Sequence, residues 1–176
     1  GPGPRLSGDP VTDAEFLARL VASRTVTAGP NLVLIDWVEG TLTAAGFAVT
    51  RVPSACGTKA GLLARKGQGP GGLLLSAHSD VVPVDGQAWT TDPFALTPRA
   101  DRLVGRGATD MKGFLACVLA RALQLDAPNH PMMIALSWDE EIGCRGIAAV
   151  LLYTSDAADE SRSVDLVGRR LNKYKT

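Results

Sequence analysis

The chain has 176 residues, 45% of them hydrophobic, and its 18 basic and 18 acidic residues cancel, so we expect one α/β domain with a single core. Because no block of like charge stands out, neither a nucleic acid nor a membrane surface is expected as a partner. No apolar run reaches the roughly 18 residues of a membrane span, and the start lacks the apolar stretch of a secretory signal, so a cytoplasmic protein is expected.

Two helices are predicted in the first third of the chain, after a start at residues 1–10 that we expect to be disordered. Thr12 and Glu15 have the spacing of a capping box, and apolar residues then recur at helical spacing. Asn31 is a favourable N-cap for a second helix that runs to Ala45.

The next elements are predicted to be strands with one helix between them. Residues 47–52 are rich in β-branched side chains, and residues 61–66 and 73–77 flank a glycine-rich turn, which predicts a hairpin. Residues 111–122 have the apolar spacing of a helix. The apolar runs at 73–75 and 132–136 are typical of interior strands. The fold class that follows is α/β, with helices on both faces of a mostly parallel or mixed sheet.

The first candidate site is His78 with Asp80, at the carboxyl end of the strand predicted at 73–77. Imidazole is a preferred zinc ligand, and its second nitrogen is usually held by a carboxylate. Residues two apart on an extended segment point to the same side, so Asp80 is placed to orient His78. The alternative is a loop histidine beside a solvated acid.

The second candidate is Asp110, which follows three glycines in segment 105–113 and stands at a predicted helix start. The glycines let the backbone turn tightly and approach other groups, and the two carboxylate oxygens of Asp110 are suited to bridging two cations. The alternative is that Asp110 caps the N–H groups of the helix.

The third candidate is the run Asp139, Glu140 and Glu141, directly after the apolar strand at 132–136. Adjacent carboxylates repel one another, and metal ions would offset this repulsion. Neighbouring side chains diverge, which lets Glu141 bind a metal while Glu140 faces a substrate as general base. The alternative is an acidic helix start, which the helix dipole also favours.

All three candidates lie at strand carboxyl ends or at the helix starts that follow, where α/β sheets bind their ligands. One histidine with several carboxylates suits zinc, cobalt or manganese. No serine or cysteine stands in the sequence context of a nucleophile, so activated water is the expected nucleophile. The other histidine, His130, is interpreted as an exposed turn residue. Cys56, Cys117 and Cys144 are interpreted as reduced, half-buried thiols.

At these motifs the sequence resembles the M20 family of dinuclear zinc peptidases and deacylases. The resemblance spans residues 11–150 and is carried by segments 75–86, 89–94, 105–113 and 139–144. It implies two divalent metal ions, most simply zinc, with His78 on one ion, Glu141 on the other and Asp110 bridging both. It also implies that Asp80 supports His78 and that Glu140 is the proton shuttle.

The resemblance further implies a cis peptide after Asp110, a homodimer, and a role in cytoplasmic arginine biosynthesis. The implied substrate is a small N-acyl amino acid, N-acetyl-L-ornithine, with N-succinyl-diaminopimelate as the alternative. Residues 11–150 would form the amino-terminal part of a zinc-peptidase-like catalytic domain. The family's lid and dimerisation domain, its Gly-Glu-Pro-Thr carboxylate and its final histidine are absent, so a non-catalytic fragment with an incomplete site stays open.

Residues 151–176 look unlike the family and resemble a translated sequencing adaptor. We expect this tail to be poorly ordered and without function. A divergent polar tail is the alternative, and it would also lack a packed core.

Overall fold

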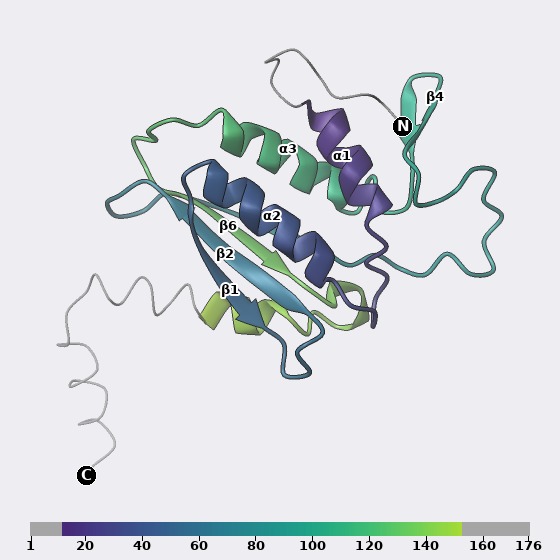
Figure 1. Cartoon of the computed structure of the whole chain (residues 1–176), viewed down its shortest axis with the longest axis horizontal. Coiled ribbons are helices and arrows are strands. Elements are labelled where there is room, and N and C mark those ends of the chain that lie inside the picture. Colours follow the sequence, from purple (N-terminus) through teal and green to yellow (C-terminus); the bar gives the residue numbers. More distant parts are fainter. Residues whose placement is uncertain (1–11, 153–176) are drawn as a thin grey trace, which may run out of the picture.

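A computed structural model describes residues 12–152 of the chain (Figure 1). The start expected to be disordered lies outside this range. Only the first two residues of the expected tail are described, and they continue a short helix at 147–152. Among the described residues no helix is long and apolar enough to cross a membrane.

The first helix, α1 (Asp13–Ala22), begins at the predicted capping box. The backbone N–H of Thr12 donates to Glu15 Oε2 at 2.8 Å, and the backbone N–H of Glu15 donates to Thr12 Oγ1 at 3.4 Å. Two of the N–H groups that a helix start leaves without partners are satisfied in this way. The apolar face of α1 packs against α3 (Lys112–Leu123), which is predicted to within one residue.

The second helix, α2 (Leu32–Ala44), follows Asn31 as predicted, but the Asn31 side chain does not cap it. Instead the buried Asn31 amide donates to Ala60 O at 2.8 Å and to Ser79 Oγ at 3.0 Å, and it accepts from Ala60 N at 2.9 Å. The Asn31 side chain thus bonds to residues far away in the sequence and not to the N–H groups of the helix that follows it. Asn31 therefore ties the start of α2 to two strand ends of the sheet.

The central sheet has four strands in the order β1-β2-β6-β3. β1 (Ala48–Pro53) pairs antiparallel with β2 (Ala60–Lys66), β2 pairs antiparallel with β6 (Met132–Ser137), and β6 pairs parallel with β3 (Leu73–His78). A separate two-stranded sheet, β4 (Thr97–Arg99) with β5 (Arg102–Val104), projects from the rest of the fold (Figure 1). Gly105, directly after β5, lies against Val21 near the carboxyl end of α1. The central sheet is mixed, in agreement with the predicted fold class.

The predicted hairpin between residues 61–66 and 73–77 is wrong, because β6 lies between β2 and β3. The glycine-rich turn at 67–72 carries the chain past the start of β6. Gly72 at φ 110° lies so close to Pro131 that an added Cβ would be 2.1 Å from the Pro131 carbonyl oxygen. The hairpin of this sheet is instead β1–β2, whose strands are joined by residues 54–59.

The prediction of interior strands is correct for β6 and wrong for β3. In β6, Ile134, Ala135 and Leu136 are buried. β3 is an edge strand in the described part of the chain, and its Leu73 is 58% exposed. A continuous apolar run thus marks both a strand covered on each side and a strand with one side open.

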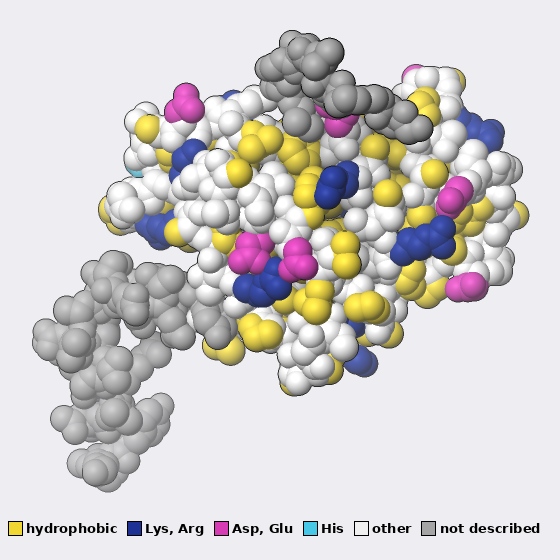
Figure 2. Space-filling model, in the orientation of Figure 1, with side chains coloured by type: hydrophobic (Ala, Val, Ile, Leu, Met, Phe, Trp, Pro, Cys, Tyr) yellow, Lys and Arg dark blue, Asp and Glu magenta, His cyan; other side chains and the backbone are white. Residues whose placement is uncertain are grey.

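Helices cover both faces of the sheet. On one face α2 packs on β1 and β2, and α3 packs on β3, enclosing the main core (Figure 1). On the other face a smaller cluster forms below the helix at 147–152; its buried members are Val52, Leu63, Ala135, Trp138 and Val150. On the face drawn in Figure 2, the described acidic and basic side chains are scattered among apolar ones, without a continuous patch of one charge.

Candidate metal centre

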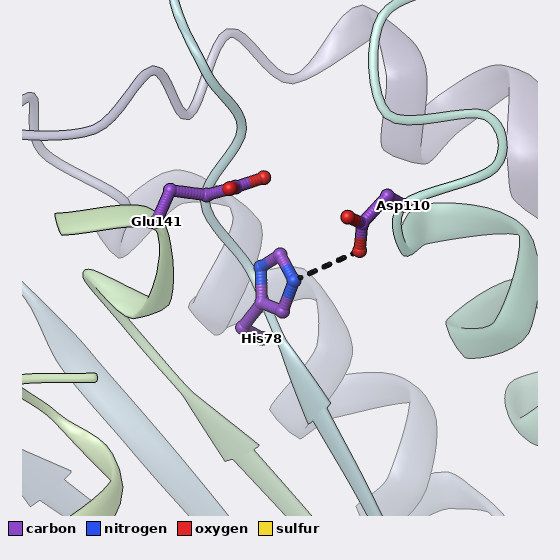
Figure 3. A group of neighbouring side chains, drawn as sticks. All are labelled: His78, Asp110 and Glu141. Atoms are coloured by element: carbon purple, nitrogen blue, oxygen red, sulfur yellow. Dashed lines mark hydrogen bonds and ion pairs between the residues drawn. The ribbon is translucent and has the colours of Figure 1, made fainter. Parts of the chain in front are cut away.

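Three candidate side chains converge where β3 and β6 end. The parallel register places His78 beside Ser137, so the carboxyl ends of these strands meet at one edge. Glu141 comes from the 3₁₀ turn η1 (Glu140–Ile142) after β6, and Asp110 comes from the loop before α3. One ligand atom from each of His78, Asp110 and Glu141 lies within 4.8 Å of the other two (Figure 3).

His78 is buried and has its two ring nitrogens in different surroundings. Nδ1 lies 3.0 Å from the backbone oxygen of Asp80 and 3.4 Å from its Oδ1. Nε2 lies 3.3 Å from Asp110 Oδ1 and 3.7 Å from Glu140 Oε2. One nitrogen is held by the protein while the other faces the acids, which is the arrangement of a metal-binding histidine.

The protonation of His78 reflects these neighbours. Burial lowers the pKa of His78, but the hydrogen bond and charge of Asp80, together with Asp110, outweigh burial and raise the pKa to about 9. In the absence of a metal the ring is therefore a cation at neutral pH. A divalent ion can take the place of this proton, because a metal-binding imidazole must be neutral.

Asp80 holds two parts of the site at once. Besides contacting His78, its carboxylate accepts hydrogen bonds from the backbone N–H groups of Glu140 at 3.1 Å and Glu141 at 3.2 Å. Burial raises the pKa of Asp80, but His78 and these two N–H groups outweigh it and hold the pKa below its usual range. The carboxylate predicted to orient His78 thus also fixes the turn that carries both glutamates.

Asp110 is not a helix cap. α3 begins at Lys112, its N-cap position is Met111, and no side chain caps it. The peptide bond between Asp110 and Met111 is cis, as the family resemblance implies. The Asp110 side chain is 74% exposed and directs Oδ1 toward His78 (Figure 3). The structure therefore supports the ligand interpretation of Asp110 over the capping interpretation.

Both glutamates of the turn bring a carboxylate close to His78. The Glu141 carboxylate extends over His78 in the direction of Asp110 (Figure 3). Burial and the negative charge of Asp110 raise the pKa of Glu141, against the opposing effect of His78. A carboxylate whose pKa is raised by burial and by a negative neighbour is stabilised in its charged form by a bound cation.

The third acid of the run, Asp139, has a protein partner that the sequence pattern does not indicate. Its Oδ1 lies 2.5 Å from Lys59 Nζ, and both side chains are buried. For one of the three adjacent acids, the expected offsetting positive charge is therefore a lysine of the protein itself. Lys59 offsets Asp139, whereas Glu141 lies in the group of side chains that could hold a metal ion.

Lys112 is a second buried cation that sequence reasoning missed. It is fully buried, and its Nζ donates to the backbone oxygen of Ser23 at 2.7 Å. Burial lowers the pKa of Lys112 to about 8, against the opposing charge of Asp80. The contact ties the loop that carries Asp110 to the end of α1.

The remaining candidate side chains lie on the surface. His130 is exposed, as predicted. The expectation of half-buried thiols is wrong, because Cys56, Cys117 and Cys144 are all exposed and free. Cys117 lies on a helix whose buried face is formed by its neighbours, so helical periodicity turns its thiol outward.

Comparison with known proteins places this site in a family. Residues 74–167, more than half of the chain, match the sequence model of peptidase family M20/M25/M40. The chain belongs to this family. The M20 match contains His78, Asp110 and both glutamates.

Curated M20 relatives carry one recurring name. The chain is 43% identical over 136 residues to an acetylornithine deacetylase of Myxococcus xanthus, covering 74% of this chain and 35% of the relative. It is 38% identical over 157 residues to an acetylornithine deacetylase of Photorhabdus laumondii, covering 82% and 40%. The chain therefore spans between 35% and 40% of the length of these two relatives.

Solved structures of M20 proteins share the fold. Human carnosine dipeptidase 1 superposes with a TM-score of 0.66 at 30% identity, covering 84% of this chain and 36% of that protein. The M20 family metallo-carboxypeptidase Sso-CP2 of Sulfolobus solfataricus superposes with a TM-score of 0.60 over 70% of this chain and 30% of that protein. At 23% identity the second likeness concerns the fold alone.

Proposed function

We propose that His78, Asp110 and Glu141 form part of a dinuclear metal centre of an amide hydrolase, with Glu140 as its general base. The observation that carries the proposal is the convergence of the three ligand atoms within 4.8 Å, from three segments far apart in the sequence. Imidazole nitrogen with carboxylate oxygen suits zinc first and cobalt as a substitute. The remaining ligands would come from the part of the relatives that this chain does not span.

The residues divide the chemistry between them. Divalent ions bound at this site would polarise the amide carbonyl and lower the pKa of water. Glu140 takes the proton of the attacking water and returns it to the leaving amine nitrogen. Its Oε2 lies 3.7 Å from His78 Nε2, on the side where the metal ligands gather. Asp80 holds the Glu140 backbone in place through its hydrogen bond of 3.1 Å.

For the full-length protein we propose N-acetyl-L-ornithine as the substrate, which hydrolysis would convert to acetate and ornithine. The names of the relatives at 38% and 43% identity support this assignment. Dipeptide hydrolysis is the second candidate, supported by the 30% identity to human carnosine dipeptidase 1 over 84% of this chain. A cytoplasmic homodimer that acts in arginine biosynthesis completes the proposal.

Two measurements test the proposal. Isothermal titration with zinc should show binding to the purified chain and its loss in His78→Ala, and equal binding by this variant would refute the site. For activity, residues 12–152 would replace the matching part of the Myxococcus xanthus relative. The chimera should hydrolyse N-acetyl-L-ornithine in preference to N-succinyl-diaminopimelate and carnosine, and Glu140→Gln should abolish turnover while sparing zinc binding.

A further inference from the structure

The ion pair between Lys59 and Asp139 follows from the register of the sheet. β2 and β6 are antiparallel, with Leu62 opposite Leu136. Continuing that register past the ends of both strands brings Lys59 opposite Asp139. The chain therefore places a cation directly across from the residue that precedes Glu140 and Glu141.

Both partners of this pair are buried. Lys59 is 6% exposed and Asp139 is 8% exposed, and the Nζ to Oδ1 distance is 2.5 Å. A buried charge without a partner is costly, so each group constrains the position of the other. The backbone of Lys59 is itself fixed, because its N–H donates to Ser54 Oγ at 3.2 Å and its carbonyl accepts from Ser54 N at 2.9 Å.

Asp139 is the pivot of the turn that presents the glutamates. It has φ 55° and ψ 38°, in the left-handed region, where aspartate and asparagine are tolerated better than most residues. The turn closes on its other side where Arg145 N donates to Asp139 O at 3.1 Å. Because Asp139 reverses the chain direction here, the N–H groups of Glu140 and Glu141 face the Asp80 carboxylate.

We infer that Lys59 is a positioning residue of the proposed metal centre: through Asp139 it fixes the turn that carries Glu140 and Glu141. Lys59 also neutralises the charge of Asp139, next to a site that already contains four other carboxylates. The inference rests on the proposed metal-binding function and adds to it a residue from the β1–β2 hairpin, outside the segments that carry the site motifs.

The experiment is a cobalt titration of the full chain with three variants. Lys59→Met removes the cation, and Asp139→Asn removes the anion but keeps a residue that tolerates the left-handed conformation. The double variant Lys59→Met with Asp139→Asn leaves no buried charge unpaired, so it tests the inference even where Lys59→Met fails to fold. We expect Lys59→Met and the double variant to bind cobalt about 10- to 100-fold more weakly, with a weaker visible absorption.

The effects of the two substitutions on cobalt affinity should not be additive. Once Lys59 is gone, the further change of Asp139 should weaken binding by less than about threefold, because the two side chains act as a pair. Circular dichroism would establish that each variant is folded. A folded Lys59→Met variant, or a folded double variant, with wild-type cobalt affinity and spectrum would overturn the inference.

Two control variants separate positioning from general effects. Arg51→Met removes another cation of the same sheet, one paired with Asp36 and Glu39, and should leave cobalt affinity unchanged within about twofold. Leu42→Ala destabilises the core away from the site and should lower the unfolding temperature without changing the cobalt spectrum. Wild-type affinity in His78→Ala would instead show that the proposed metal site itself is wrong.

Discussion

Asp80 is the residue whose contacts reach furthest within the site, since it touches His78 and the backbone of both glutamates. Asp80→Asn keeps the size of the side chain but replaces one acceptor oxygen with a donor, which opposes one of the two backbone N–H groups. We expect zinc affinity to fall about 10- to 100-fold, measured by competition with a chromophoric chelator. Asp85→Asn, an exposed acid in the loop that follows, is the matched control and should bind as the wild type does.

The cysteines provide a prediction about reactivity. Hydrogen bonds from Ser54 and Thr58 lower the pKa of Cys56 to about 7. Partial desolvation by neighbouring atoms raises the pKa of Cys117 and, together with Glu140, that of Cys144, although both thiols are exposed. Of the three thiols, Cys56 therefore carries the largest thiolate fraction near neutral pH, and this fraction falls as the pH drops.

Iodoacetamide at pH 7 should therefore modify Cys56 first, as followed by peptide mass spectrometry. Ser54→Ala should slow that reaction, because it removes the first cause of the lowered pKa. Equal rates at all three exposed thiols would contradict the assignment.

For single residues, the sequence predicts the side chains that carry chemistry better than the side chains that hold them in place. The sequence predicts that His78, Asp110 and Glu141 lie together because each follows the carboxyl end of a strand or precedes a helix, and in the structure they do. The contact between Lys59 and Asp139 depends on a strand register that local patterns do not contain. The same holds for Asn31, whose distant partners only the folded sheet supplies.

Among the elements, the end of β6 is held by close backbone packing around Trp138. A Cβ added at Gly61 would lie 2.5 Å from Leu136 O and 3.0 Å from the Trp138 ring. Gly61→Ala should therefore lower the free energy of unfolding by about 1–3 kcal/mol, measured by urea denaturation.

Gly40→Ala is the matched control for this substitution. Gly40 lies inside α2 and has nothing within 4 Å of an added Cβ. Alanine at a free helical position stabilises by about 0.5–1 kcal/mol, so the two substitutions should have opposite signs. Two shifts of the same sign would contradict the packing argument.

The sequence predicts helices well where the apolar periodicity extends over several turns, as in α1 and α3. It predicts poorly which strands pair with each other in the sheet. The glycine-rich turn at 67–72 is equally compatible with a hairpin and with a crossing past β6. The insertion of β6 between β2 and β3 decides between them, and β6 lies about 60 residues further along the chain.

On the scale of the whole molecule, the two sheet edges differ. The β1 edge carries Arg51 and ends at Pro53, which both discourage further strand pairing. The β3 edge begins with Leu73 and Leu74, which are 58% and 37% exposed, and has no charged residue before His78. An uncharged apolar edge is a template for association between chains.

Leu73→Lys should therefore reduce self-association of the chain, measured as apparent mass by light scattering over a range of concentrations. Thr50→Lys on the β1 edge is the control and should have little effect, because that edge already carries a charge. Identical concentration dependence in the wild type and Leu73→Lys would show that association, if any, uses another surface.

The exposure of Asp110 bears on how quickly a bound ion is exchanged. With 74% of this side chain open to solvent, an ion held between Asp110 and His78 has a direct path to water on one side. Release then requires no unfolding, and we expect chelators to remove the ion at a rate that rises with chelator concentration. Metal content measured after gel filtration would therefore underestimate equilibrium occupancy, whereas titration with free metal present would report it.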